Sequence, residues 1–131
     1  MTLLYNKIQR SNPAKPEDPK KWYLSLKSLG LIREKEVARQ IADETTLNPK
    51  EAEMALAQLE KILIRLLLDG HTVQLGDWGS FYLTLSCTGA ATEKEAVPAN
   101  IAKINIRFQP GKGLKTAIAA AAFKPAADLA K

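Results

Sequence analysis

The sequence has few of the residues that build disulfide frameworks, metal centres or catalytic sites. Among its 131 residues there is one cysteine, Cys87, and one histidine, His71. A single cysteine excludes an internal disulfide framework and a cysteine-rich zinc site, and it fits a reducing compartment. Neither residue has a partner at a spacing typical of catalysis. We therefore expect no enzymatic activity, metal, cofactor or small-molecule substrate.

Long hydrophobic runs are also missing. No window approaches the roughly 20 apolar residues of a membrane span, and the first ten residues lack the apolar stretch of a signal peptide. We therefore expect a cytoplasmic protein that does not contact a membrane. With 46% hydrophobic residues, the chain is still long enough to form one domain with a core.

Charge is distributed unevenly along the chain. The formal net charge is +5, with +4 in residues 1–27, +5 in residues 101–131, and −2 in each of the stretches 28–70 and 71–100. If the fold brings the two ends together, they would form a patch that favours polyanions. From the charge alone, an ordinary solvated surface is an equally good interpretation.

The N-terminal part predicts a small pair of strands. Apolar and polar residues alternate in residues 3–10 and again in 22–26, and the prolines of residues 12–19 exclude a helix between them. Such a pair is not stable alone, so we expect it to dock on the rest of the chain. For Trp22 and Tyr23, packing is a more common role than base stacking.

Two helices are expected next, over residues 32–44 and 49–69. Asn48 to Glu51 form a strong helix start, with a capping asparagine, a proline at the first helical position and a glutamate three residues after the cap. Gly70 supplies the C-terminal turn. The segment 62–68 is apolar around nearly its whole circumference, which argues for burial on two sides and hence for an isologous dimer.

A β-hairpin with an arm follows, formed by residues 73–85 and 103–109. Gly76 and Gly79 bracket a tight bend at its beginning. In residues 103–109, apolar side chains alternate with polar and cationic ones. One face of this strand therefore fits a core, and the other fits a polyanion.

A last helix is expected after the strand. Pro110-Gly111 end the strand, and Lys112 and Lys115 lie in the first helical turn. Basic side chains and free amide N–H groups at a helix start suit phosphate. We expect this helix to continue through the alanine run 119–122 and to end near Phe123.

The segments Val73–Phe81 and Phe108–Lys115, in this order of elements, resemble the HU/IHF family of bacterial histone-like DNA-binding proteins over about residues 32–120. The chain also resembles the branch of that family with an N-terminal strand pair before the first helix. The resemblance implies an α+β fold of two helices, a hairpin sheet with a short arm and a C-terminal helix, assembled as an intertwined homodimer over double-stranded DNA. The expected organisation is a strand-pair extension (1–28), an HU-like DNA-binding domain (29–125) and a frayed tail (126–131).

The resemblance and the strand pattern together suggest two sets of functional residues. The expected DNA contacts are Lys103, Asn105, Arg107, Gly111, Lys112 and Lys115. The expected dimer core consists of Leu59, Ile62, Leu63, Leu66, Leu67, Phe81 and Phe108. Trp78 replaces a residue that is commonly Phe in the family, and we expect it in the interior.

The arm, Cys87 to Asn100, departs from the family pattern. It contains no arginine and two glutamates, and Pro98 is its only candidate for a wedge between base steps. Strong bending of DNA is therefore not expected. Our leading hypothesis is a dimeric, largely sequence-independent, nucleoid-associated DNA-binding protein. The alternative is an HU-like scaffold that serves as a structural or protein-interaction module, with the strand pair covering part of the nucleic-acid surface.

Overall fold

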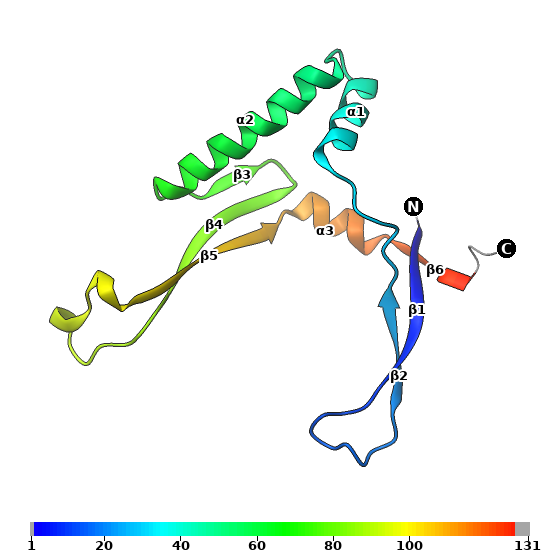
Figure 1. Cartoon of the computed structure of the whole chain (residues 1–131), viewed down its shortest axis with the longest axis horizontal. Helices are drawn as coiled ribbons and strands as arrows, with labels where there is room; N and C mark the ends of the chain where they lie inside the picture. The colour runs from blue at the N-terminus through cyan, green and yellow to red at the C-terminus, as the bar shows by residue number, and fades with distance from the viewer. Residues whose placement is uncertain (1, 128–131) are drawn as a thin grey trace. The chain divides into compact units, whose positions relative to one another are not determined.

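The computed structural model describes residues 2–127. Its elements follow the expected order of two strands, two helices, a hairpin sheet and a helix, and one further strand ends the series (Figure 1). Their bounds are β1 (Thr2–Arg10), β2 (Lys21–Leu26), α1 (Glu34–Glu44), α2 (Pro49–Leu68), β3 (Val73–Leu75), β4 (Gly79–Cys87), β5 (Ile101–Pro110), α3 (Lys112–Ala119) and β6 (Ala122–Pro125). The α+β class is therefore confirmed. In the described part of the chain, no helix combines the length and hydropathy needed to cross a membrane.

The backbone divides into two units. One joins residues 2–32 with residues 117–127, and the other consists of residues 33–116. The division expected from the sequence, with residues 29–125 as one domain, stays a prediction; in the backbone, β6 pairs with β1 of the N-terminal unit. Of the expected frayed tail, the part from 128 onward lies outside the described residues.

The N-terminal unit contains a three-stranded sheet in the order β2-β1-β6. The antiparallel pair β1–β2 is the expected one, but β6 pairs in parallel with β1, with Thr2 opposite Ala122 and Leu3 opposite Phe123. The expectation that Ala119–Ala122 would continue the helix to Phe123 is thus wrong, because α3 ends at Ala119. Pairing with the free edge of β1 outweighs the helix propensity of alanine, since a two-stranded ribbon alone is only marginally stable.

Local interactions define both ends of α2 in the second unit. At its start, the Asn48 side chain accepts a hydrogen bond from the Glu51 N–H at 2.8 Å, and its amide donates to the Glu51 carboxylate. At its end, the Gly70 N–H donates to Leu67 O and the His71 N–H donates to Leu66 O, both at 3.0 Å, with Gly70 at φ +94°. This pattern is a Schellman motif, so the predicted helix start and stop are both confirmed.

Small residues let the two helices approach each other. Ala38 of α1 and Ala52 of α2 are fully buried, and Leu67 is the only large side chain of this unit that is buried. The remaining apolar side chains along α2 are half-buried or exposed. The chain alone therefore encloses very little apolar volume in this unit.

The second sheet has the order β3-β4-β5, with both pairs antiparallel. β4 and β5 form a long ribbon that continues into the arm, and α2 lies along β3 and the beginning of β4 (Figure 1). Gly79 begins β4 at φ +154°, where an added Cβ would lie 2.5 Å from the carbonyl oxygen of Gln109. Only glycine fits this close approach of two backbones.

Candidate nucleic-acid interface

One face of the β4–β5 ribbon carries polar and cationic side chains. The register sets Lys103 opposite Ser86, Asn105 opposite Thr84, and Arg107 opposite Tyr82. Since residues two apart in a strand share a face, these six side chains lie on one side of the ribbon, and Lys103 and Arg107 are separated by roughly 13 Å along β5. The three residues of β5 are the ones expected to contact DNA, and the fold brings them onto one surface.

Some side chains on this face are held by hydrogen bonds, and others are exposed and unpaired. The Asn105 amide donates a hydrogen bond to the Ser86 hydroxyl at 2.8 Å, and this side chain is half-buried. Lys103 and Arg107 are exposed, and neither forms an ion pair in the described residues. Two unpaired cations therefore flank an amide that is already held in place.

The opposite face of the ribbon is apolar. It carries Phe81, Leu83, Leu85, Ile104, Ile106 and Phe108. Leu85, Ile104 and Ile106 are between 57% and 58% exposed, and Phe108 is 40% exposed. Six apolar side chains on one face form a surface that a folded soluble protein normally covers.

The N-terminus of α3 is attached to the bend between β3 and β4. The Gly111 N–H donates to Trp78 O at 2.9 Å, and the Leu114 N–H donates to Asp77 O at 3.3 Å. A Cβ at Gly111 would lie 2.3 Å from Asp77 O, so the absence of a side chain is necessary for this contact. The Gly111 amide, expected to be free for phosphate, is thus already used within the fold.

An acidic side chain also lies at this helix start. A Cβ at Gly113 would be 2.7 Å from the Asp77 Cβ and 3.5 Å from its carboxylate oxygen. A carboxylate here interacts favourably with the helix dipole and offsets its attraction for other anions. Attraction for phosphate at this point must therefore come from the exposed side chains of Lys112 and Lys115. Asp77 is not among the residues expected from the sequence, although the paired glycines 111 and 113 indicate a close approach by some other group.

The two strands of the hairpin do not continue through the arm. β4 ends at Cys87, and two short 3-10 helices, Glu93–Glu95 and Pro98–Asn100, replace extended strands. The Thr88 N–H donates to Asn100 O at 2.9 Å, and the Asn100 side chain donates to Glu95 O at 3.2 Å. Pro98 thus begins a turn at the base of the arm.

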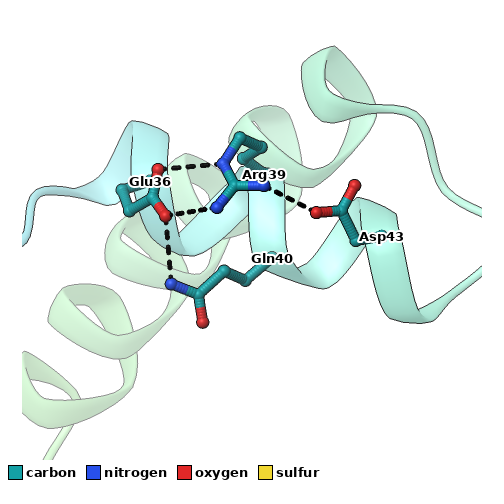
Figure 2. A network of polar contacts seen from close by, with 4 residues as sticks. All are labelled: Glu36, Arg39, Gln40 and Asp43. Atoms are coloured by element: carbon teal, nitrogen blue, oxygen red, sulfur yellow. Dashed lines mark hydrogen bonds and ion pairs between the residues drawn. The ribbon is translucent and has the colours of Figure 1, made fainter.

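Three charged residues of α1, Glu36, Arg39 and Asp43, pair with one another. Arg39 donates to the Glu36 carboxylate at 2.6 and 3.0 Å and to Asp43 at 2.7 Å, and Gln40 donates to Glu36 at 3.1 Å (Figure 2). The hydrogen bonds from Arg39, with the smaller contribution of Gln40, lower the pKa of Glu36 to about 2. Arg39 is therefore not a free cation for a polyanion.

The expected dimer core is only partly covered by the chain itself. Leu67 is buried, and Leu59, Ile62, Leu63, Leu66 and Phe81 are half-buried. The Phe81 ring lies 4.9 Å from that of Phe108 and 6.0 Å from that of Trp78. Trp78 is nevertheless 51% exposed, so the expectation of an interior tryptophan is not met within this chain.

Two aromatic residues of the N-terminal sheet are also exposed. Trp22 is 67% and Tyr23 is 48% accessible, so their expected packing role is not met within this chain. Adjacent strand residues point to opposite faces of the sheet. The two rings therefore belong to two different surfaces.

The fold so described is that of an HU-like α+β protein. The family described as "HU domain fused to wHTH, Ig, or Glycine-rich motif" matches residues 1–125, and the chain belongs to this family. The suspected HU-like character is thereby confirmed, and the match includes the N-terminal strands.

A solved structure has the same fold. It is a 2.25 Å crystal structure described as a "Putative bacterial DNA binding protein" from Bacteroides vulgatus ATCC 8482, with a TM-score of 0.66 and 15% identity over 95% of this chain. This chain spans 48% of that protein, about half its length. Similarity at this identity establishes a shared fold only. No curated protein matches the sequence.

Proposed function

We propose that this protein is a dimeric, largely sequence-independent DNA-binding protein of the nucleoid, acting in the cytoplasm. Lys103 and Arg107 of β5 and Lys112 and Lys115 of α3 would contact backbone phosphates of double-stranded DNA, with Asn105 beside them. The observation that carries the proposal is the separation of the β4–β5 ribbon into a polar, cationic face and an exposed apolar face. Membership of the HU family and the description of the neighbouring structure support DNA as the partner.

The exposed surface of the chain supports a dimer. The chain exposes 11215 Å². A compact monomer of 14.4 kDa exposes roughly 6,800 Å², and two separate compact bodies of the sizes of its two units would expose roughly 8,200 Å². The remaining excess of about 3,000 Å² per chain amounts to about 6,000 Å² over two chains, which is at the upper end of what an obligate homodimer covers. The apolar face of the ribbon and the half-buried side of α2 are the surfaces that a second copy would cover.

A polar substitution on this apolar face tests the dimer. In a lone chain, Ile106→Gln should be nearly neutral, because the side chain is 58% exposed. If a partner covers Ile106, the same change should destabilise the dimer by about 2 kcal/mol. Urea unfolding at two protein concentrations distinguishes these cases, and a neutral result that is independent of concentration would contradict dimerisation through this face.

The arm supports binding with weak or no kinking. Between Thr88 and Asn100, Lys94 is the only cation, and Glu93 and Glu95 would repel phosphates. Kinking in the minor groove requires an apolar wedge between base steps, whereas Pro98 is constrained in a turn by the hydrogen bonds of Asn100. We expect the end-to-end distance of a doubly labelled duplex to be unchanged on binding. Clear shortening at saturation would contradict this part of the proposal.

A salt titration tests the phosphate contacts. Each neutralised phosphate contributes roughly 0.9 to the slope of log affinity against log salt, so Lys112→Gln with Lys115→Gln should lower the slope by about 1.8 per protomer. The double variant Lys50→Gln with Lys61→Gln removes the same charge from α2 and serves as the matched control. Equal slopes in all three proteins would remove α3 from the interface.

A second candidate function has its own support. On one face of the N-terminal sheet, Trp22, Leu24, Leu26 and Phe123 are all between 63% and 67% exposed. A protein-interaction module would use such a surface, and the HU-like scaffold would then bind little DNA. A mobility-shift assay on random duplex at about 50 mM salt separates the two functions, because even a weak phosphate binder should shift there.

A further inference from the structure

The loop end of the β1–β2 hairpin holds two cations side by side. Arg10 and Lys21 are the terminal pair of the ladder and lie directly opposite each other, so their side chains share one face of the sheet. Like charges directly opposite each other destabilise a strand pair, and an anion bound between them would offset this repulsion. Among residues 2–127, the ion pairs are those of Arg39, so neither Arg10 nor Lys21 is neutralised in this way.

A recess lies beside these two cations. Its volume is about 430 Å³, and its lining includes Arg10, Lys21, Tyr23, Asn12 and Asp18. Tyr23 is two residues from Lys21 on the same strand, so its half-exposed ring lies on the same face as the cations. The carboxylate of Asp18 offsets one charge, and the lining keeps a net positive charge.

Hydrogen bonds and prolines restrain the loop that closes the recess. The Ala14 N–H donates to the Asn12 side chain at 3.0 Å, and the N–H groups of Lys15 and Asp18 donate to Asn12 O and Lys15 O at 3.1 and 3.0 Å. Pro13, Pro16 and Pro19 further limit the backbone. A loop restrained in this way loses little conformational entropy when it binds a ligand.

We propose that Arg10 and Lys21 form a second binding site for the phosphodiester backbone of nucleic acid, separate from the one on β5 and α3. A guanidinium, an ammonium and a phenol hydroxyl can all donate to phosphate oxygens, and the recess is large enough for a nucleotide unit. The excess of positive charge in residues 1–27 favours a polyanion over an isolated anion. The inference rests on the proposed function, since it takes the same DNA as the partner.

Two DNA-binding sites on one chain have a measurable consequence for the affinity. Once either site is bound, the other engages the same duplex at a high effective concentration, so the loss of one site weakens binding without abolishing it. If Arg10 and Lys21 each neutralise one phosphate, Arg10→Gln with Lys21→Gln should lower the salt slope by about 1.8 per protomer. For the contacts of one protomer, this corresponds to roughly 60-fold weaker binding at 0.1 M salt relative to a 1 M reference; when both protomers of the dimer contact the duplex, the slope falls by about 3.6 and the factor is roughly 4,000.

The experiment is a fluorescence anisotropy titration of the full chain with a labelled random duplex over about 50–300 mM salt. Lys15→Gln with Lys20→Gln removes the same charge from the same hairpin but from residues that do not line the recess. We expect the slope to fall for the first pair and to change little for the second. The charge-conserving pair Arg10→Lys with Lys21→Arg should retain most of the slope, which would show that the slope depends on the two charges.

Three results would overturn the inference. Equal losses for the two hairpin pairs would indicate a general effect of net charge, and no loss for either would leave DNA contacts only on β5 and α3. Binding of the hairpin cations to vesicles of phosphatidylcholine and phosphatidylserine, with no effect on DNA, would assign the site to a lipid headgroup. Failure of the wild-type chain to bind duplex at all would instead overturn the proposed function itself.

Discussion

The close approach at Gly79 makes a stability prediction that follows directly from the geometry. In Gly79→Ala, the new Cβ would lie 2.5 Å from Gln109 O, whereas ordinary contact begins at 3.4 Å, so the strands would have to separate by about 0.9 Å. A ladder hydrogen bond does not survive such a shift, and each one lost costs about 1 kcal/mol. The backbone at φ +154° adds roughly 1–3 kcal/mol of strain for any residue with a side chain. We therefore expect a total loss of about 2–4 kcal/mol.

Two other glycines distinguish the two causes of this stability loss, the steric contact and the backbone strain. Gly76 has φ +58° but nothing within 4 Å of an added Cβ, so Gly76→Ala should show the backbone cost alone, about 1–2 kcal/mol. Gly89 has neither feature, and Gly89→Ala should be nearly neutral. Urea unfolding of the three variants at one fixed protein concentration gives the comparison. Equal stabilities of Gly79→Ala and Gly89→Ala would refute the reasoning.

The remaining predictions concern local charges and caps. Asp77→Asn should tighten DNA binding by about 0.3–1 kcal/mol, roughly two- to fivefold, because the carboxylate beside α3 repels phosphate; weaker or unchanged affinity by anisotropy would count against this. Asn48→Ala should lower the free energy of unfolding by about 1 kcal/mol, since the Glu51 N–H loses its acceptor, and an unchanged urea midpoint would contradict the cap. The pKa of Glu36 is lowered from its ordinary value of 4.5 to about 2. The ionised carboxylate therefore stabilises the folded state at pH values above 4.5, and this stabilisation is lost as the pH falls toward 2. Unfolding midpoints of the wild type and Glu36→Gln should therefore converge over that range, and a constant difference would argue against the Arg39 contact.

The sequence predicted the elements whose signals are local. The cap at Asn48, the C-terminal turn at Gly70 and the alternation in β5 each depend on neighbouring residues, and all three are present as expected. The combination of the bend and the Pro-Gly-Lys helix start was specific enough to indicate the HU family. Local chemistry was thus sufficient for the class and for the order of elements from β1 to α3.

Contacts between distant segments were not predictable from the sequence. β6 pairs with an edge of β1, and nothing in Ala122–Pro125 indicates a parallel partner more than a hundred residues away. The use of the Gly111 amide by Trp78 and the position of Asp77 at α3 likewise depend on how the bend meets the helix. The ring of Trp78 is exposed in the single chain. The sequence of one chain does not indicate which surface of another chain would cover this ring.

Sedimentation of the full chain with and without a short random duplex, at about 50 mM and about 300 mM salt, is the most direct test of a dimer that binds DNA through its backbone. The account predicts that the free protein sediments at the mass of two chains, that the duplex moves with it at the lower salt, and that the higher salt releases the duplex while the dimer persists. A single chain at all concentrations, or a dimer that leaves the duplex behind at the lower salt, would contradict it.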